Sequence, residues 1–218
     1  MKVEELLRQG QGLWRGSELS QEPDPGIATG FSSLDKQLPG RGWPRGAISE
    51  ILSDRPGGAM ALLMPALVTL SRQSQQIILV APPYIPYAPG FSINGVDLSR
   101  LLLVNGRDEK ECLWVLEQVL NAGCGAALSW PQRLSRMALR RLQLAAERGG
   151  GIGFLLRQPQ FSAESSPAAL RLRISAAGNL ADILKRRGGW PVKGIRLDVN
   201  DSDHCAKNVI FACDQRGE

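Results

Sequence analysis

The sequence has very little of what most metal sites and histidine-based active sites require. Its 218 residues include one histidine, His204, and four cysteines, and no two cysteines are separated by two residues. These numbers exclude the usual zinc ligand sets and a Ser-His-Asp type of triad. Reduced thiols in a cytoplasmic protein are the simplest explanation for unpaired cysteines. We therefore expect no metal site and no histidine-based catalysis.

The sequence also lacks membrane and export signals. No apolar run approaches the roughly 20 residues that a membrane-spanning helix needs. The first residues, MKVEELLRQGQ, are too acidic and too interrupted by polar residues to resemble a secretory signal. We expect a cytoplasmic protein without membrane contacts.

The charge is unevenly distributed along an otherwise ordinary globular composition. Hydrophobic residues make up 43% of the chain, charged residues make up 22%, and the net charge is +5. Between Leu128 and Val199 there are 13 Lys or Arg residues and four Asp or Glu residues. Such a basic half suits a polyanion or an acidic protein partner. A solvated charged surface explains the same numbers, so both interpretations stay open.

The most informative stretch is Gly46 to Ala66, GAISEILSDRPGGAMALLMPA. It predicts a buried strand over Ala47–Leu52, a tight turn over Ser53–Gly58 and an apolar helix from Ala59 onward. In a phosphate-binding loop, a strand, a glycine-rich turn and a helix N-terminus follow one another in this order.

The residues that bind phosphate and magnesium are missing from this stretch. Aligned with G-x-x-x-x-G-K-[ST], the eight positions run from Ser53 to Met60, and the second glycine is kept as Gly58. Ala59 stands at the lysine position and Met60 at the hydroxyl position, while Asp54 adds a negative charge. We therefore expect a degenerate loop (Ser53, Gly58, Ala59, Met60), no bound cofactor and no enzymatic activity.

The remaining pattern predicts an α/β protein with a mostly parallel sheet flanked by helices and extended by strands near the C-terminus. Gln76–Ala81 and Ala126–Trp130 are continuous apolar runs and should be inner strands beside Ala47–Leu52. Helices are expected over 59–70, 108–122 and 131–148, and further strands over 98–105, 152–157, 170–175 and 194–199. The strand at 126–130 ends in Ser-Trp-Pro, without the metal-organising acid of an ATPase.

We divide the chain into three parts. Residues 1–26 form a short amphipathic helix, which includes Trp14, and a linker; residues 27–199 form the core domain, and residues 200–218 form a tail. The helix either lies on the core or docks on a neighbouring protein. In the core, Thr29 or Ser32 should cap a short helix that carries Leu34 and Leu38.

Two groups of cations are candidates for partner binding. Lys185, Arg186 and Arg187 are expected in an exposed basic turn that ends in two glycines. Arg133, Arg136 and Arg140 are expected on one exposed helix face, with Arg171 and Arg173 on one face of a strand. No aromatic residue is interleaved with these cations, so we expect at most weak, salt-dependent DNA binding without base stacking.

The chain resembles the ImuA family of the RecA-like superfamily. The matching segments occur in order between Leu13 and Val199: LWRG, TGF-SSLD-KQLPGRGWPRGA, LLMPAL, APPYIPYAP, ALSW, RRLQLAAE, SPAALRLR and LKRRGG. The core over 46–157 is also similar to SulA, a cell-division inhibitor of the SOS response. SulA lacks the long segment before the first strand and ends soon after 157, so these two additional parts favour ImuA.

The resemblance implies a RecA-like fold and an accessory role in mutagenic translesion DNA synthesis. The implied partners are RecA, an ImuB-type polymerase-like adaptor and an error-prone polymerase, with self-association as a further expectation. The alternative is a SulA-like inhibitor that binds FtsZ. A DNA-stimulated ATPase is the third class of function considered, and the substitutions at Ala59 and Met60 argue against it.

Overall fold

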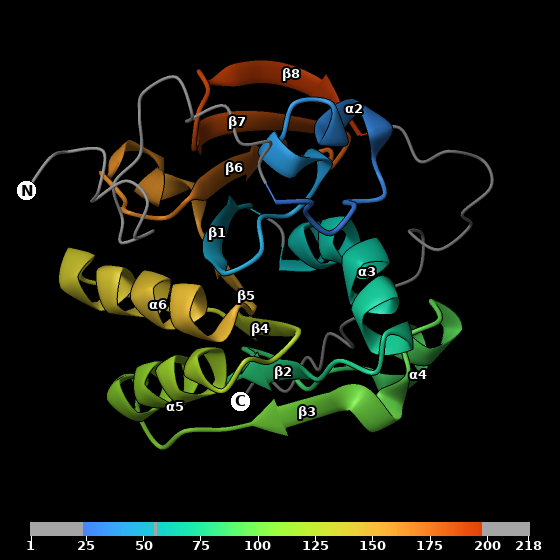
Figure 1. Ribbon diagram of the computed structural model, residues 1–218, viewed down its shortest axis with the longest axis vertical. Helices are drawn as coiled ribbons and strands as arrows, with labels where there is room; N and C mark the ends of the chain where they lie inside the picture. Colours follow the sequence, from blue (N-terminus) through green and yellow to red (C-terminus); the bar gives the residue numbers. More distant parts are fainter. Residues whose placement is uncertain (1–23, 55, 198–218) are drawn as a thin grey trace, which may run out of the picture.

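The computed structural model describes residues 24–54 and 56–197, and these form a single eight-stranded sheet with helices on both faces (Figure 1). The strand order is β3-β2-β4-β5-β1-β6-β7-β8. The strands are β1 (Ala47–Leu52), β2 (Ile77–Val80), β3 (Leu101–Val104), β4 (Ala126–Ser129), β5 (Ile152–Arg157), β6 (Leu170–Ile174), β7 (Leu180–Arg186) and β8 (Val192–Arg196).

The sheet changes from parallel to antiparallel at β6. All pairs from β3 to β6 are parallel, whereas β6–β7 and β7–β8 are antiparallel. The predicted α/β class with strands added near the C-terminus is therefore confirmed. The three predicted inner strands are β1, β2 and β4, and every residue in them is buried. Their continuous apolar sequences reflect this burial on both faces.

The described helices cover the two faces unequally. They are α2 (Ser32–Asp35), α3 (Pro56–Arg72), α4 (Ala88–Ile93), α5 (Glu109–Asn121) and α6 (Arg136–Gly149), with 3₁₀ turns η1 (Pro39–Arg41), η2 (Leu98–Arg100) and η3 (Pro159–Ala163). The larger buried cluster packs α3 and the segment before β1 against one face of the sheet. A smaller cluster packs α5 and α6 against the other face.

Side-chain caps determine where α5 and α6 begin. The Asp108 carboxylate accepts the backbone N–H of Glu111 at 2.8 Å, and the Ser135 hydroxyl accepts the N–H of Ala138 at 3.1 Å. Such N-caps satisfy donors that have no partner within the helix. The expected start of α6 at Pro131 is therefore wrong, because the cap at Ser135 delays the helix to Arg136.

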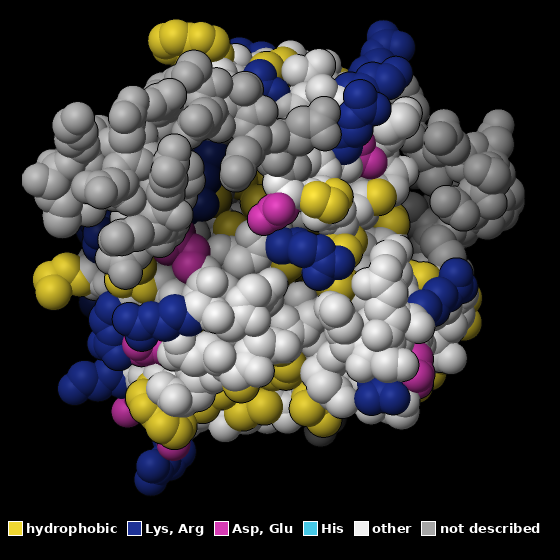
Figure 2. All heavy atoms as spheres, in the orientation of Figure 1, with side chains coloured by type: hydrophobic (Ala, Val, Ile, Leu, Met, Phe, Trp, Pro, Cys, Tyr) yellow, Lys and Arg dark blue, Asp and Glu magenta, His cyan; other side chains and the backbone are white. Residues whose placement is uncertain are grey.

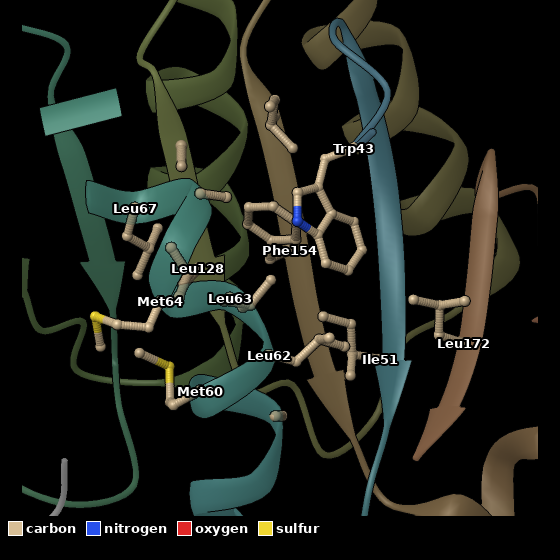
Figure 3. Packing of buried hydrophobic residues seen from close by; sticks show 14 of the residues in the cluster. Trp43, Ile51, Met60, Leu62, Leu63, Met64, Leu67, Leu128, Phe154 and Leu172 are labelled. Atoms are coloured by element: carbon tan, nitrogen blue, oxygen red, sulfur yellow. The ribbon is translucent and has the colours of Figure 1, made fainter. Parts of the chain in front are cut away.

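The segment before β1 is part of the core. Its apolar residues Ile27, Phe31, Leu34 and Leu38 are buried, and Trp43 is fully buried in an edge-to-face contact with Phe154, with the ring centres 5.1 Å apart (Figure 3). Neither predicted cap of α2 is formed: the residue that precedes the helix is Phe31, which makes no side-chain cap. The Thr29 hydroxyl instead accepts the N–H of Phe31 outside the helix.

We predict that Trp43→Ala lowers the free energy of unfolding by about 3–5 kcal/mol, because it leaves a cavity beside Phe154 in the larger cluster. Urea unfolding followed by circular dichroism measures this loss. Trp114→Ala is the matched control, since Trp114 is 59% exposed and its loss should change the stability by less than about 0.5 kcal/mol. Equal effects of the two variants would show that the segment before β1 contributes little to the fold.

Candidate functional site

The connection between β1 and α3 is shorter than the sequence predicts. β1 ends at Leu52 as expected, but α3 begins at Pro56 and not at Ala59. Proline suits the first turn of a helix because its φ is already helical and its missing N–H would have no helical partner there. The predicted turn over Ser53–Gly58 is therefore wrong, since its last three residues belong to the helix.

The four residues of the predicted degenerate loop differ in how far they are buried. Ala59 and Met60, at the lysine and hydroxyl positions, are 2% and 0% exposed and belong to the larger buried cluster. Figure 3 shows Met60 within this cluster. Ser53 and Gly58 are half-buried, and the backbone N–H of Ser53 donates to the Arg157 carbonyl at 3.0 Å. This N–H is thus engaged within the sheet and does not point to a phosphate.

A small pocket lies where β1, β4 and β5 end. It has a volume of about 160 Å³ and is lined by residues that include Ser53, Asp54, Tyr84, Trp130 and Arg157. Pockets for drug-sized ligands typically measure about 300–1,000 Å³. The acid that would bind magnesium is replaced at the end of β4 by the buried Ser129. Within the described residues, the space and the lining side chains therefore do not suit a nucleotide with its metal ion.

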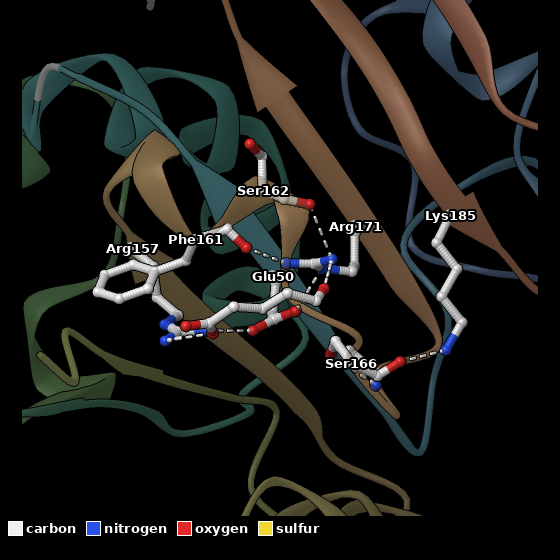
Figure 4. A network of polar contacts seen from close by, with 9 residues as sticks. Glu50, Arg157, Phe161, Ser162, Ser166, Arg171 and Lys185 are labelled. Carbon is white, nitrogen blue, oxygen red and sulfur yellow. Dashed lines mark hydrogen bonds and ion pairs between the residues drawn. The ribbon is translucent and has the colours of Figure 1, made fainter. Parts of the chain in front are cut away.

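A buried ion network connects β1, β5 and β6 (Figure 4). Glu50 of β1 is fully buried between two neighbouring strands, β5 and β6. Its carboxylate accepts from Nη1 of Arg157 at 3.0 Å and pairs with Nε of Arg171 at 2.6 Å. Both arginine side chains are at most 5% exposed. The network joins the parallel strands to the first strand of the C-terminal extension.

The two arginines also hold the segment that follows β5. Arg171 donates to the carbonyls of Phe161 at 2.9 Å and of Glu164 at 2.6 Å. The Arg157 guanidinium lies 4.1 Å from the centre of the Phe161 ring and reaches the Glu164 carboxylate at 3.4 Å. Two guanidinium groups are thus balanced by two carboxylates. The expectation that Arg171 adds to a basic surface is wrong, and its partner Glu50 was not identified from the sequence.

The structure separates the cations predicted on one helix face. Arg133 precedes α6, and its backbone N–H donates to the Glu109 carboxylate at 2.7 Å. Arg136 and Arg140 are exposed and lie one turn apart on α6. Arg173 is exposed and pairs with Asp182 at 2.7 Å. Trp14 lies outside the described residues, so its partner-binding role stays a prediction.

The predicted basic turn is only partly a turn. Strand β7 continues through Lys185 and Arg186, which are half-buried. Lys185 donates to the Ser166 carbonyl at 2.6 Å, and the Arg186 guanidinium donates to the Gln37 carbonyl. Arg187 is exposed and pairs with Glu147 of α6 at 2.6 Å. Backbone carbonyls thus serve as partners for two of these three cations.

The end of β7 and the exposed face of α6 lie close together. Burial lowers the pKa of Lys185, and the nearby charges of Arg171, Arg187 and Arg136 lower it further, against the opposing effect of Glu50. The hydrogen bond from Arg187 lowers the pKa of Glu147, and Arg140 acts in the same direction. We call Arg136, Arg140, Lys185 and Arg187 the α6–β7 cation cluster. Figure 2 shows Lys and Arg side chains in separate groups on one face, with uncharged surface between them.

Two other kinds of site are absent from residues 24–54 and 56–197. In this part of the chain no group of three or more His, Cys, Asp or Glu side chains has the proximity that a metal ion needs. The same residues include no helix with the length and apolar character to span a bilayer.

Comparisons with known proteins point to two related groups. Protein ImuA of Caulobacter vibrioides is 34% identical over 146 residues, which is 64% of this chain and 60% of that protein. The cell division inhibitor SulA of Cronobacter sakazakii is 28% identical over 134 residues, 59% of this chain and 80% of that protein. The chain is homologous to ImuA and to SulA.

Further comparisons define the extent of this similarity. SulA from Pseudomonas aeruginosa, whose crystal structure is known, has 30% sequence identity to this chain. The structural match covers 51% of this chain and 97% of the SulA chain, with a TM-score of 0.45. No family model matches the sequence. The similarity to ImuA extends over less than two thirds of that relative's length.

We predict that Glu50→Ala lowers the free energy of unfolding by about 3–5 kcal/mol, because two buried guanidinium groups lose their shared carboxylate. Urea unfolding measures the change. Glu164→Ala is the matched control: the Glu164 side chain is 52% exposed, so losing its pair with Arg157 should cost at most about 1 kcal/mol. Replacing all three members of the Glu50 network with apolar residues should restore much of the lost stability. A Glu50→Ala protein as stable as the control would contradict the structural role of the network.

Proposed function

We propose that this protein is a non-catalytic accessory protein of SOS-induced translesion DNA synthesis. The observation that carries the proposal is the 34% identity to protein ImuA over 146 residues. In this role the protein acts through contacts with other proteins, and mutagenic repair depends on the assembly that it helps to form. The proposal concerns the whole protein, although the similarity extends over 64% of the chain.

We further propose a RecA-like core with a phosphate loop that has lost its function. A parallel strand, a short connection and a buried helix follow one another at the edge where β1, β4 and β5 end, and this arrangement supports the proposal. Ala59 and Met60 are built into the apolar core, so their replacement by lysine and threonine would place polar groups there. This burial supports a scaffold that has adapted to the absence of ATP.

The proposed partners are RecA, an ImuB-type polymerase-like adaptor and an error-prone polymerase. The α6–β7 cation cluster is the described surface that we assign to such contacts, because Arg136, Arg140 and Arg187 are exposed and Glu147 forms an ion pair with one of them, Arg187. An acidic partner surface would complement this charge. Self-association through residues 1–26 is a further part of the proposal.

A second candidate function is inhibition of cell division through FtsZ. The similarity to proteins named cell division inhibitor SulA, over 59% of this chain for the Cronobacter protein, favours it. The ImuA similarity is stronger and extends over 64% of the chain. We therefore rank the translesion role first.

Affinity capture from DNA-damaged cells should separate the two functions. We predict that the tagged full-length protein captures RecA and a polymerase-like adaptor in amounts that rise after damage, and that FtsZ stays at the level of the untagged control. Quantitative mass spectrometry of both samples measures the ratio. Enrichment of FtsZ without RecA or the adaptor would support the SulA-like function instead.

We predict that calorimetric titration with Mg-ATP detects no site with a dissociation constant below about 1 mM, and that ATP hydrolysis stays at background with and without DNA. The reason is the missing lysine and hydroxyl at Ala59 and Met60, together with the 160 Å³ pocket. A double variant, Ala59→Lys with Met60→Thr, should lose stability and gain no ATPase activity. Heat changes that fit a micromolar site in the unmodified protein would overturn the non-catalytic proposal.

A further inference from the structure

Trp190 is the most exposed of the large apolar side chains in the described residues, at 85%. It lies in the connection between β7 and β8, directly after Gly188 and Gly189 and before Pro191. An indole in this position leaves a large flat apolar surface in water, whereas buried tryptophans such as Trp43 stabilise the core. Exposed aromatic side chains on a rigid support are frequent binding determinants.

The backbone of this connection is fixed at its base. The N–H of Arg187 donates to the Ala169 carbonyl at 3.1 Å, and Gly188 has a φ of +68°, which glycine adopts without strain. Gly189 packs closely on Arg186, so that a Cβ at this position would lie 2.3 Å from Nε of that side chain. Arg186 is itself held by the Gln37 carbonyl. Trp190 is therefore presented on a fixed turn next to the core.

Several cations lie near this turn, either in the sequence or at the end of β7. Arg187 is three residues from Trp190, and Lys193 follows it on β8, where it is exposed. Arg136 and Arg140 of the α6–β7 cation cluster lie near the end of β7. The charge of Arg136 lowers the pKa of Lys185 in β7, and the charge of Arg140 lowers the pKa of Glu147, which pairs with Arg187. Glu147 lies beside this cluster and forms an ion pair with one of its cations, Arg187.

We propose that the turn over 187–191 and the adjoining cations of α6 form a binding site for single-stranded nucleic acid. In this site a base stacks on the indole of Trp190, while the exposed Arg136 and Arg140 neutralise neighbouring phosphates. The site shares Arg136 and Arg140 with the surface that the proposed function assigns to protein partners, and it adds a nucleic-acid ligand to that surface. The sequence pattern alone does not indicate base stacking, because Trp190 follows the cations Lys185, Arg186 and Arg187 and is not interleaved with them.

The geometry favours a single strand over a duplex. Bases in a duplex are already stacked on one another, so a lone indole on a turn gains a partner only where a base is free. Recognition of a duplex also draws on many phosphate contacts, whereas this site offers the two exposed cations Arg136 and Arg140. Such a pair suits a short stretch of flexible backbone that passes over the turn.

A second exposed tryptophan supplies a matched control. Trp114 of α5 is 59% exposed and lies in a groove between α5 and α6. Two ion pairs, Arg107–Glu111 at 3.1 Å and Arg141–Glu117, neutralise the charges around it. Trp114 therefore offers an aromatic surface without an excess of cations, and we expect no nucleic-acid binding there.

Fluorescence anisotropy with a labelled 15-nucleotide oligo-dT at low salt tests the proposal in the full-length protein. We expect Trp190→Ala to weaken binding between about fivefold and a hundredfold, since one stacked base is lost. Trp190→Phe should keep most of the affinity, and Trp114→Ala should bind like the unmodified protein. Circular dichroism and thermal unfolding should be unchanged in all three variants, because both tryptophans are exposed.

An abasic strand of the same length separates stacking from charge. The unmodified protein should bind oligo-dT more tightly than the abasic strand, and Trp190→Ala should bind both equally. Arg136→Gln with Arg140→Gln should lower the slope of log affinity against log salt by about 0.7 for each phosphate that the variant no longer neutralises.

Three results would overturn the site. They are absence of oligo-dT binding at low salt, equal binding by Trp190→Ala and the unmodified protein, and equal affinity of the unmodified protein for both strands. Loss of RecA or adaptor capture in Trp190→Ala, without any oligonucleotide binding, would assign the turn to a protein partner instead. Because ATP binding and capture of the adaptor are measured separately, failure of the nucleic-acid site leaves the proposed function intact.

Discussion

The ion network at Glu50 is the constraint on which the rest of the fold depends. A carboxylate without access to water is stable at the centre of a sheet only when nearby cations balance its charge. Arg157 and Arg171 provide this balance from the two strands that flank β1, so the order β5-β1-β6 is required for the charge to be paired. The same arginines hold the segment after β5 through Phe161 and Glu164. The parallel core and its C-terminal extension are thereby one structural unit.

This arrangement explains why an edge that binds ligands in many α/β folds has so little room here. Ligands of open α/β sheets usually lie beyond the carboxyl ends of the strands. In this protein Arg157 is engaged with Glu50 and Phe161, and Ala59 is part of the apolar core at the start of α3. Among the described residues, the charge of Arg157 at this edge is paired internally, and the exposed cations Arg136, Arg140 and Arg187 lie elsewhere, at α6 and the end of β7. Surface contacts therefore carry the proposed function.

The inner strands could be predicted because their burial on both faces leaves continuous apolar sequence, as in Ala47–Leu52. Helix starts were predicted less accurately. The side-chain cap at Ser135 makes α6 begin later than the sequence pattern indicates, and Pro56 makes α3 begin earlier. The Glu50 network was missed because Glu50 lies 107 residues before Arg157 and meets its arginines only through the strand order. The partners of Lys185 and Arg186 at the end of β7 are backbone carbonyls. Counting acidic and basic residues in the sequence cannot identify such partners. Exposure, which distinguishes Trp190 from Trp43, depends on the complete fold.

The central claim is that this chain assists mutagenic DNA synthesis and does not block cell division. Its most direct test is the frequency of damage-induced mutation in cells that lack the gene and in cells to which it is restored, with cell length recorded in the same cultures. The account predicts that induced mutation falls in the deletion strain and returns with the restored gene, while filamentation is the same in both. Unchanged mutation frequency together with loss of damage-induced filamentation in the deletion strain would contradict it.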